Sequence, residues 1–186
     1  MSELKSAWEV AQERANRLGK LSAEEKEQQQ KQGYRQIGQA LAQKWMDSSQ
    51  RLDVTAELGK YEEKDRDVIK QAMIEQLIGV FGFANIQAID NMKRVIKAIS
   101  SLRPELQPKA EEVGQLVQEY ELAEEKIRQE LESSYRATLH QLRISGTAVD
   151  VINIETNPQW QQARQGLVED FTPRLNDLKQ ALTGTR

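Results

Sequence analysis

The sequence contains no cysteine, one histidine, four prolines and ten glycines among its 186 residues. Without cysteine the chain can form no disulfide, thiolate nucleophile or cysteine-ligated metal site, and nothing points to an oxidising compartment. A di-iron helical bundle takes Glu-x-x-His motifs from two helices, and a catalytic triad needs a correctly placed histidine. The single His140 has no carboxylate three or four residues away. We therefore expect no metal site and no cofactor.

Long hydrophobic runs are also missing. The longest stretch without a charged residue, residues 76–89, has 14 residues, whereas a membrane-spanning helix needs about 20 mostly apolar ones. The first residues lack the basic patch and apolar run of a signal peptide. The sequence therefore predicts a soluble, cytoplasmic protein without membrane contact.

The chain lacks the glycine-rich motifs G-x-x-x-x-G-K-[ST] and G-x-G-x-x-G that bind nucleotide phosphates. Charged residues make up 30% of the chain and the net charge is −3, so the basic excess that favours nucleic acid is absent. One basic cluster offers candidate phosphate contacts for a ribosome- or RNA-associated factor, namely Lys93, Arg94 and Lys97. We favour the alternative, a solvated or internally paired face, because residues 109–132 are rich in acids.

The abundant polar residues are Gln, Glu, Lys and Arg, which lose little side-chain freedom in a helix. We predict an all-α fold, an antiparallel bundle of three long helices preceded by shorter N-terminal amphipathic helices. The long helices are expected over 65–102, 108–142 and 158–182. Glycines 79 and 82 lie inside the first element, so it is either one helix or two helices joined at Gly82.

Prolines indicate where the later helices begin. Pro108 suits the first turn of the second long helix, and Asn157 followed by Pro158 suits the cap and first turn of the third. Pro173 interrupts the third apolar stripe without changing its phase. We therefore expect a kink there and one continuous helix.

The apolar pattern divides the chain near residue 50. Residues 51–186 carry the rich stripes of the bundle, whereas residues 1–50 form a thinner arm. This arm is expected to hold one amphipathic helix over 3–18, a polar spacer over 20–32 and a second amphipathic stretch over 34–46. Ser22 and Glu25 have capping-box spacing, which predicts a helix start there.

The connection over 144–156 exceeds the roughly 2 to 8 residues usual between bundled helices. Its Val and Ile residues favour an ordered loop or short strand. We expect it either to cover the end of the bundle or to line the pocket of a helical enzyme or small-ligand carrier. The polar candidates for that pocket are Ser145, Thr147, Asp150 and Asn153.

Two tryptophans in the arm, Trp8 and Trp45, lie in segments too polar to form a core alone. Aromatic anchors on amphipathic helices are typical of helix-in-groove binding, although both helices can instead pack on the bundle. Our leading hypothesis is a non-enzymatic interaction, scaffold or adaptor protein that binds a protein partner or itself through residues 1–46. The partner-binding candidates are Leu4, Trp8, Ala11, Leu18, Tyr34, Ile37, Leu41 and Trp45.

Overall fold

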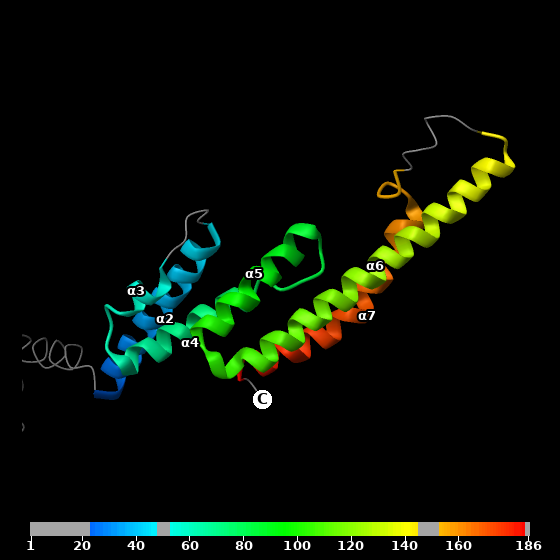
Figure 1. Ribbon diagram of the computed structural model, residues 1–186. Helices are drawn as coiled ribbons and strands as arrows, with labels where there is room; N and C mark the ends of the chain where they lie inside the picture. The colour runs from blue at the N-terminus through cyan, green and yellow to red at the C-terminus, as the bar shows by residue number, and fades with distance from the viewer. Residues whose placement is uncertain (1–22, 48–52, 145–152, 185–186) are drawn as a thin grey trace, which may run out of the picture. The chain divides into compact units, whose positions relative to one another are not determined.

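The computed structural model describes residues 23–47, 53–144 and 153–184 (Figure 1). They form α2 (Ala23–Asp47), α3 (Val54–Leu58), α4 (Glu63–Ile78), α5 (Ile86–Leu102), the 3-10 helix η1 (Pro104–Leu106), α6 (Gln107–Gln141) and α7 (Pro158–Thr183). No strand occurs within these ranges, and the predicted all-α class is confirmed. None of the described helices is long and apolar enough to span a bilayer.

Two compact units make up the chain, Met1–Met73 and Ile74–Arg186. The boundary expected near residue 50 lies within the first unit and stays a prediction. In that unit, residues 24–32 of α2 are exposed, as their lack of an apolar face predicts. Burial in α2 begins at Gly38 and continues at Leu41 and Ala42.

At Gly38, α2 approaches α4 closely. A methyl group on Gly38 would collide with the carbonyl oxygen of Ile69 and lie 2.8 Å from the Cβ of Ala72. The absence of a side chain therefore sets the distance between the two helices, at the cost of a weaker helix former in α2.

The short helix expected between residues 51 and 63 is α3. Its cap is Asp53, whose side chain accepts a hydrogen bond of 3.0 Å from the backbone N–H of Ala56. After α3, the ring of Tyr61 meets the ring of Tyr34 edge-on at 6.1 Å between centroids. This ring contact joins the segment after α3 to α2.

In the second unit, α5 follows a non-helical linker over residues 79–85. The side chain of Asn85 caps α5 by accepting a 2.8 Å hydrogen bond from the backbone N–H of Ala88. Of the two alternatives for residues 65–102, the structure shows two helices, and the break extends over several residues on both sides of Gly82. The buried face of α5 consists of Ile89, Met92, Val95, Ile99 and Leu102.

Helix α6 has α5 and α7 as its packing neighbours. Pro108 lies in the first turn of α6, as predicted. Asn157 caps α7, which continues as one helix through Pro173 until Gly184 closes it with a φ of 69°. Figure 1 shows α6 and α7 running in opposite directions along one another, and Arg174 Nη2 lies 2.7 Å from Glu119 Oε2 across the pair.

The connection between α6 and α7 is described only at its ends, since residues 145–152 lie outside the described ranges. At its far end Ile154 is buried. Asn157 donates from its side-chain amide to the hydroxyl of Tyr135, which in turn donates to Gln159 Oε1 at 3.2 Å. This end of the connection is thus tied to α6 and to the first turn of α7.

Candidate functional site

A cluster of three aromatic rings joins the linker to α6 and α7. Phe83 of the linker stacks on Tyr120 of α6 with 4.3 Å between ring centroids. Phe171 of α7 meets both rings edge-on, at 6.0 Å from Phe83 and 5.5 Å from Tyr120. Offset and edge-on aromatic pairs add to the stability gained from burial alone. The linker is therefore anchored in the core of its unit.

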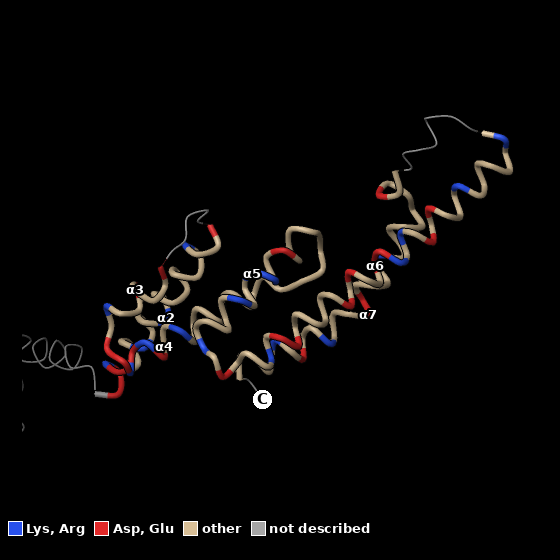
Figure 2. Tube along the Cα trace, viewed as in Figure 1, with Lys and Arg blue, Asp and Glu red and all other residues tan. Residues whose placement is uncertain are grey.

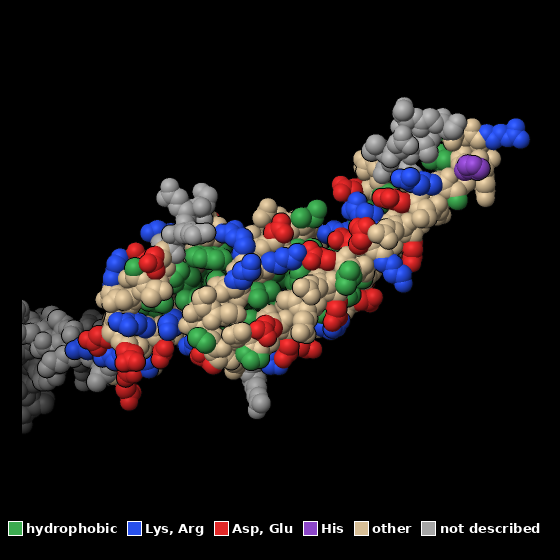
Figure 3. All heavy atoms as spheres, in the orientation of Figure 1, with side chains coloured by type: hydrophobic (Ala, Val, Ile, Leu, Met, Phe, Trp, Pro, Cys, Tyr) green, Lys and Arg blue, Asp and Glu red, His purple; other side chains and the backbone are tan. Residues whose placement is uncertain are grey.

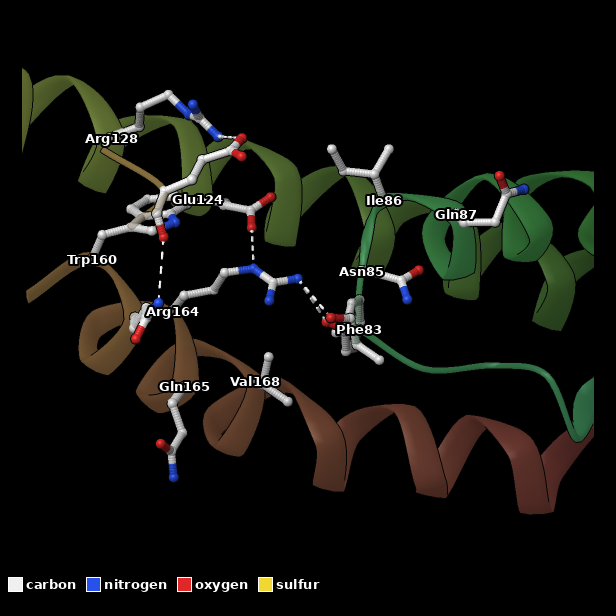
Figure 4. Close-up of a pocket in the computed structure, with 13 residues that line it drawn as sticks. Phe83, Asn85, Ile86, Gln87, Glu124, Arg128, Trp160, Arg164, Gln165 and Val168 are labelled. Atoms are coloured by element: carbon white, nitrogen blue, oxygen red, sulfur yellow. Dashed lines mark hydrogen bonds and ion pairs between the residues drawn. The ribbon is translucent and has the colours of Figure 1, made fainter. Parts of the chain in front are cut away.

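Two cations of α7 bind the main chain of the linker. Arg164 Nη2 donates to the carbonyl oxygens of Phe83 at 3.2 Å and Ala84 at 3.0 Å, and its Nε donates to Glu124 Oε1 at 2.8 Å (Figure 4). Lys179 Nζ donates to the carbonyl of Phe81 at 2.8 Å. Because a non-helical linker leaves carbonyls without helical partners, these charged donors satisfy acceptors that would otherwise be costly to bury.

Burial changes the acidity of the groups around this anchor. Burial, reinforced by the neighbouring Glu124 carboxylate, raises the pKa of the Tyr120 phenol to about 12. Burial is the largest single effect on Arg164 and opposes its charge, but the hydrogen bond and charge of Glu124 together with the contribution of Tyr120 outweigh burial and raise the pKa of the guanidinium. Burial alone lowers the pKa of Lys179. Neither Tyr120 nor Arg164 is therefore suited to exchanging protons near neutral pH.

Next to the anchor lies an open groove of about 680 Å³. Its walls come from the linker, the start of α5, the middle of α6, the first half of α7 and Glu155 (Figure 4). The lining residues are Phe83, Ala84, Asn85, Ile86, Gln87, Glu124, Arg128, Glu155, Trp160, Gln161, Arg164, Gln165 and Val168. Apolar walls with a few charged and amide groups are typical of a binding site.

Arg128 lies over the ring of Trp160, with the guanidinium carbon 4.9 Å from the ring centroid. Its nearest carboxylate oxygens are those of Glu155 at 3.7 Å and Glu125 at 4.0 Å, beyond ordinary hydrogen-bond length. Stacking on Trp160 thus orients the guanidinium, while both carboxylates stay loosely bound. On another wall of the groove, Ile86 is 67% exposed.

The described residues contain no group of three or more His, Asp or Glu side chains arranged to hold a metal ion. His140, purple in Figure 3, is exposed near the end of α6. The arrangement around the groove is therefore one of fixed charges and apolar walls, which suits binding.

Of the predicted partner-binding residues, Leu4, Trp8, Ala11 and Leu18 lie outside the described ranges. The other four are in α2. Tyr34, Ile37 and Trp45 are half-buried and Leu41 is buried. The second half of the predicted arm therefore packs within its own unit.

Of the predicted loop site, Ser145, Thr147 and Asp150 also lie outside the described ranges. Asn153 is exposed, and its side chain accepts a 3.2 Å hydrogen bond from the backbone N–H of Glu155. Glu155, which the sequence reasoning did not single out, is the member of this segment that lines the groove.

The predicted phosphate contacts lie on α5, where Figure 2 shows blue segments in a mostly tan helix, with a red segment near its start. Lys93, Arg94 and Lys97 are all exposed. Lys93 Nζ lies 2.6 Å from Glu121 Oε1 of α6, an internal pairing of the kind favoured from the sequence. Binding of RNA through the cluster stays a prediction.

The central groove residues were missed because their relationships are non-local. Trp160 falls within the third helix expected over 158–182 and Ile86 within the first element expected over 65–102, and no sequence pattern distinguishes either from an ordinary apolar residue of a helix. Arg164 and Glu124 are 40 positions apart, a spacing with no local signature. The available signal was the four-residue spacing of Glu124 and Arg128, which places both on one face of a helix.

No curated protein and no solved structure matches the chain. The model of a protein family described as "Family of unknown function (DUF6657)" matches residues 55–184. This match includes α4 to α7 and every residue that lines the groove. More than half of the sequence is covered, and the chain therefore belongs to the family of unknown function DUF6657.

Proposed function

We propose that this protein is a non-enzymatic helical adaptor or scaffold, and that its groove receives a helical segment of a protein partner. The observation that supports this most is the presence, in one groove, of the exposed Ile86 and the stacked pair Arg128 and Trp160. Arg is enriched among the residues that dominate binding energy at interfaces, and the buried Trp160 supports its guanidinium from below. Because stacking already orders Arg128, its immobilisation on binding costs little additional entropy.

The shape of the groove suits a helix. Its walls include the first turn of α5 and the facing sides of α6 and α7, so an incoming amphipathic helix adds one more helix to an existing set. Ile86 and Val168 supply apolar contacts, and fully burying a side chain such as Ile contributes about 1.5 to 3 kcal/mol. Arg128, Glu155 and the amides of the lining can pair with polar groups at the edges of that helix.

The proposal is tested with the full chain and two matched surface variants. Ile86→Glu places a charge in the groove, whereas Leu122→Glu places the same charge at a 72% exposed position of α6 that does not line the groove. A protein captured from the native host is purified and titrated against each variant. We expect Ile86→Glu to weaken binding at least about tenfold, or 1.4 kcal/mol, with Leu122→Glu near wild type. Equal affinities for both variants would overturn the proposal.

A small-ligand carrier is the second candidate, favoured by the size of the groove and by Glu155. The volume of about 680 Å³ falls within the roughly 300 to 1,000 Å³ of ligand sites. Native mass spectrometry of the full chain purified from its host tests this function. A bound small molecule that is lost on Val168→Trp, which fills the groove, would favour the carrier over the adaptor.

A further inference from the structure

We infer that the helix received by the groove carries an acidic side chain, and that its carboxylate displaces Glu155 from the neighbourhood of Arg128. The inference rests on the proposed function of the groove as a helix-binding site and adds the chemistry of the partner. It also assigns a role to Glu155, which lies 3.7 Å from Arg128 in the free protein and therefore competes with the partner for that guanidinium.

The two guanidinium groups of the groove differ in how fully their donors are used. Arg164 donates three hydrogen bonds, one to Glu124 and two to carbonyls of the linker. Arg128 donates none to any residue that the structure describes, since its nearest carboxylate oxygens lie 3.7 and 4.0 Å away. The N–H donors of Arg128 therefore remain available to a ligand.

The two carboxylates of the lining differ in the same way. The Glu124 side chain is 18% exposed and lies 2.8 Å from Arg164, so these two charges neutralise one another within the fold. The Glu155 side chain is 66% exposed, and solvent screens an exposed pair so that it contributes little. Arg128 with Glu155 is thus the pair in this groove that a ligand can exchange.

Covering Arg128 makes an acceptor necessary. Its side chain is 33% exposed, and the guanidinium lies over the ring of Trp160 (Figure 4). A helix in the groove would take water away from the remaining edges, and a guanidinium that loses water without gaining an acceptor weakens binding. A carboxylate matches the planar fork with two parallel hydrogen bonds. The helix that fits therefore carries Asp or Glu beside its apolar side.

The start of α5 favours the same sign of charge. Asn85, Ile86 and Gln87 line the groove, and they form the cap and first turn of α5, which contains no acidic residue. The positive end of a helix dipole attracts a negative charge that lies within about one turn of it. A partner lysine would meet this end and Arg128 as like charges, and would gain only the exposed Glu155.

The test begins with a displayed library of amphipathic helical peptides, selected on the full chain. Peptides that bind the wild type and Leu122→Glu, but not Ile86→Glu, are defined as groove ligands. We expect groove ligands to carry Asp or Glu at the border of their apolar side. Replacing that residue by Asn or Gln in the synthetic peptide should weaken binding at least about tenfold, as for loss of a charge-assisted hydrogen bond.

Two variants with matched controls then test Arg128 and Glu155. Arg128→Gln should weaken binding of a groove ligand at least about tenfold. Arg174→Gln should bind like the wild type, because Arg174 also lies over an aromatic ring but does not line the groove.

Glu155→Gln removes the competitor and should strengthen binding by up to about fivefold, the contribution of an exposed ion pair. Its control is Glu130→Gln, since Glu130 is likewise 66% exposed and lies 3.9 Å from its cation, outside the groove. Urea unfolding confirms that all four variants are folded.

Three results would overturn the inference: groove ligands without a preference for Asp or Glu, an Arg128→Gln variant that binds like the wild type, or weaker binding by Glu155→Gln. The last would make Glu155 itself the acceptor for Arg128 in the complex. In all three cases binding still depends on Ile86, so the proposed function stands. A selection that yields no groove ligand would count against the groove as a helix-binding site, and so against both.

Discussion

Arg164 Nε lies 2.8 Å from Glu124 Oε1, and both side chains are mostly buried, at 27% and 18% exposure. The pair joins α7 to α6 at the place where Arg164 also binds two linker carbonyls. Removing the guanidinium leaves a carboxylate and two carbonyl groups without their donor, and such loss is costly in a partly buried setting.

We therefore expect Arg164→Met to lower the free energy of unfolding by about 2 to 3 kcal/mol, a buried-pair value reduced for the remaining exposure. Urea unfolding of the full chain measures the change. The control is Arg174→Met, because the pair of Arg174 with Glu119 is 55% and 51% exposed and should contribute no more than about 1 kcal/mol. Equal losses for the two variants would contradict the role assigned to Arg164.

The Tyr120 hydroxyl is fully buried beside Glu124 and Arg164, yet it makes no well-formed hydrogen bond to any described residue. Burying an unpaired hydroxyl costs free energy. Tyr120→Phe should therefore leave the unfolding free energy unchanged or raise it by up to about 1 kcal/mol.

The matched control for Tyr120→Phe is Tyr135→Phe. The hydroxyl of Tyr135 bonds to both Asn157 and Gln159, so its removal should cost about 0.5 to 1.5 kcal/mol. Thermal and urea unfolding of the two variants give the comparison. If Tyr120→Phe lowers the free energy of unfolding more than Tyr135→Phe does, the Tyr120 hydroxyl has a hydrogen-bond partner and the prediction is wrong.

Alkaline pH provides an independent test of the burial of Tyr120. Its pKa rises from 10.0 to about 12 on folding, so between these values the unfolded chain has released the phenolic proton while the folded chain retains it. Stability therefore falls as pH rises through this window, by up to about 1.4 kcal/mol per pH unit. Tyr120→Phe should lack this contribution. If the free energies of unfolding of wild type and Tyr120→Phe change with pH in the same way from pH 9 to about pH 12, the burial of the Tyr120 phenol is contradicted.

Gly38 and Gly33 lie in the same helix and offer a paired test of the contact between α2 and α4. A methyl group at Gly33 meets no atom within 4 Å, so Gly33→Ala should stabilise the chain by about 0.5 to 1 kcal/mol through helix propensity. Gly38→Ala should destabilise it by about 1 to 3 kcal/mol, because the methyl group collides with α4. Urea unfolding measures the stability of both variants. A Gly38→Ala variant more stable than the wild type would contradict the close approach of α2 to α4.

The features predicted from the sequence are those fixed within a few residues. Pro108 and the pair Asn157 and Pro158 mark helix starts because their effects on the backbone are local. Asn85 carried a similar capping signal that was overlooked in favour of Gly82. The groove depends on contacts such as Phe83 with Tyr120 and Arg164 with Glu124, which join distant segments. Neither the period of an apolar stripe nor the spacing of charged residues shows which distant segments meet in the fold. The site could therefore be identified only from the structure.

The two α7 cations that bind the linker, Arg164 and Lys179, are made late in the synthesis of the chain, and this affects when the groove can form. Lys179 and the Phe81 carbonyl that it binds are 98 positions apart, and Arg164 lies 81 positions after Phe83. The linker is thus synthesised long before the side chains that fasten it, and contacts of such separation form late in folding. During translation the groove stays unfinished until nearly the whole protein has emerged. A nascent chain accordingly offers no completed docking site to neighbouring nascent chains on the same message.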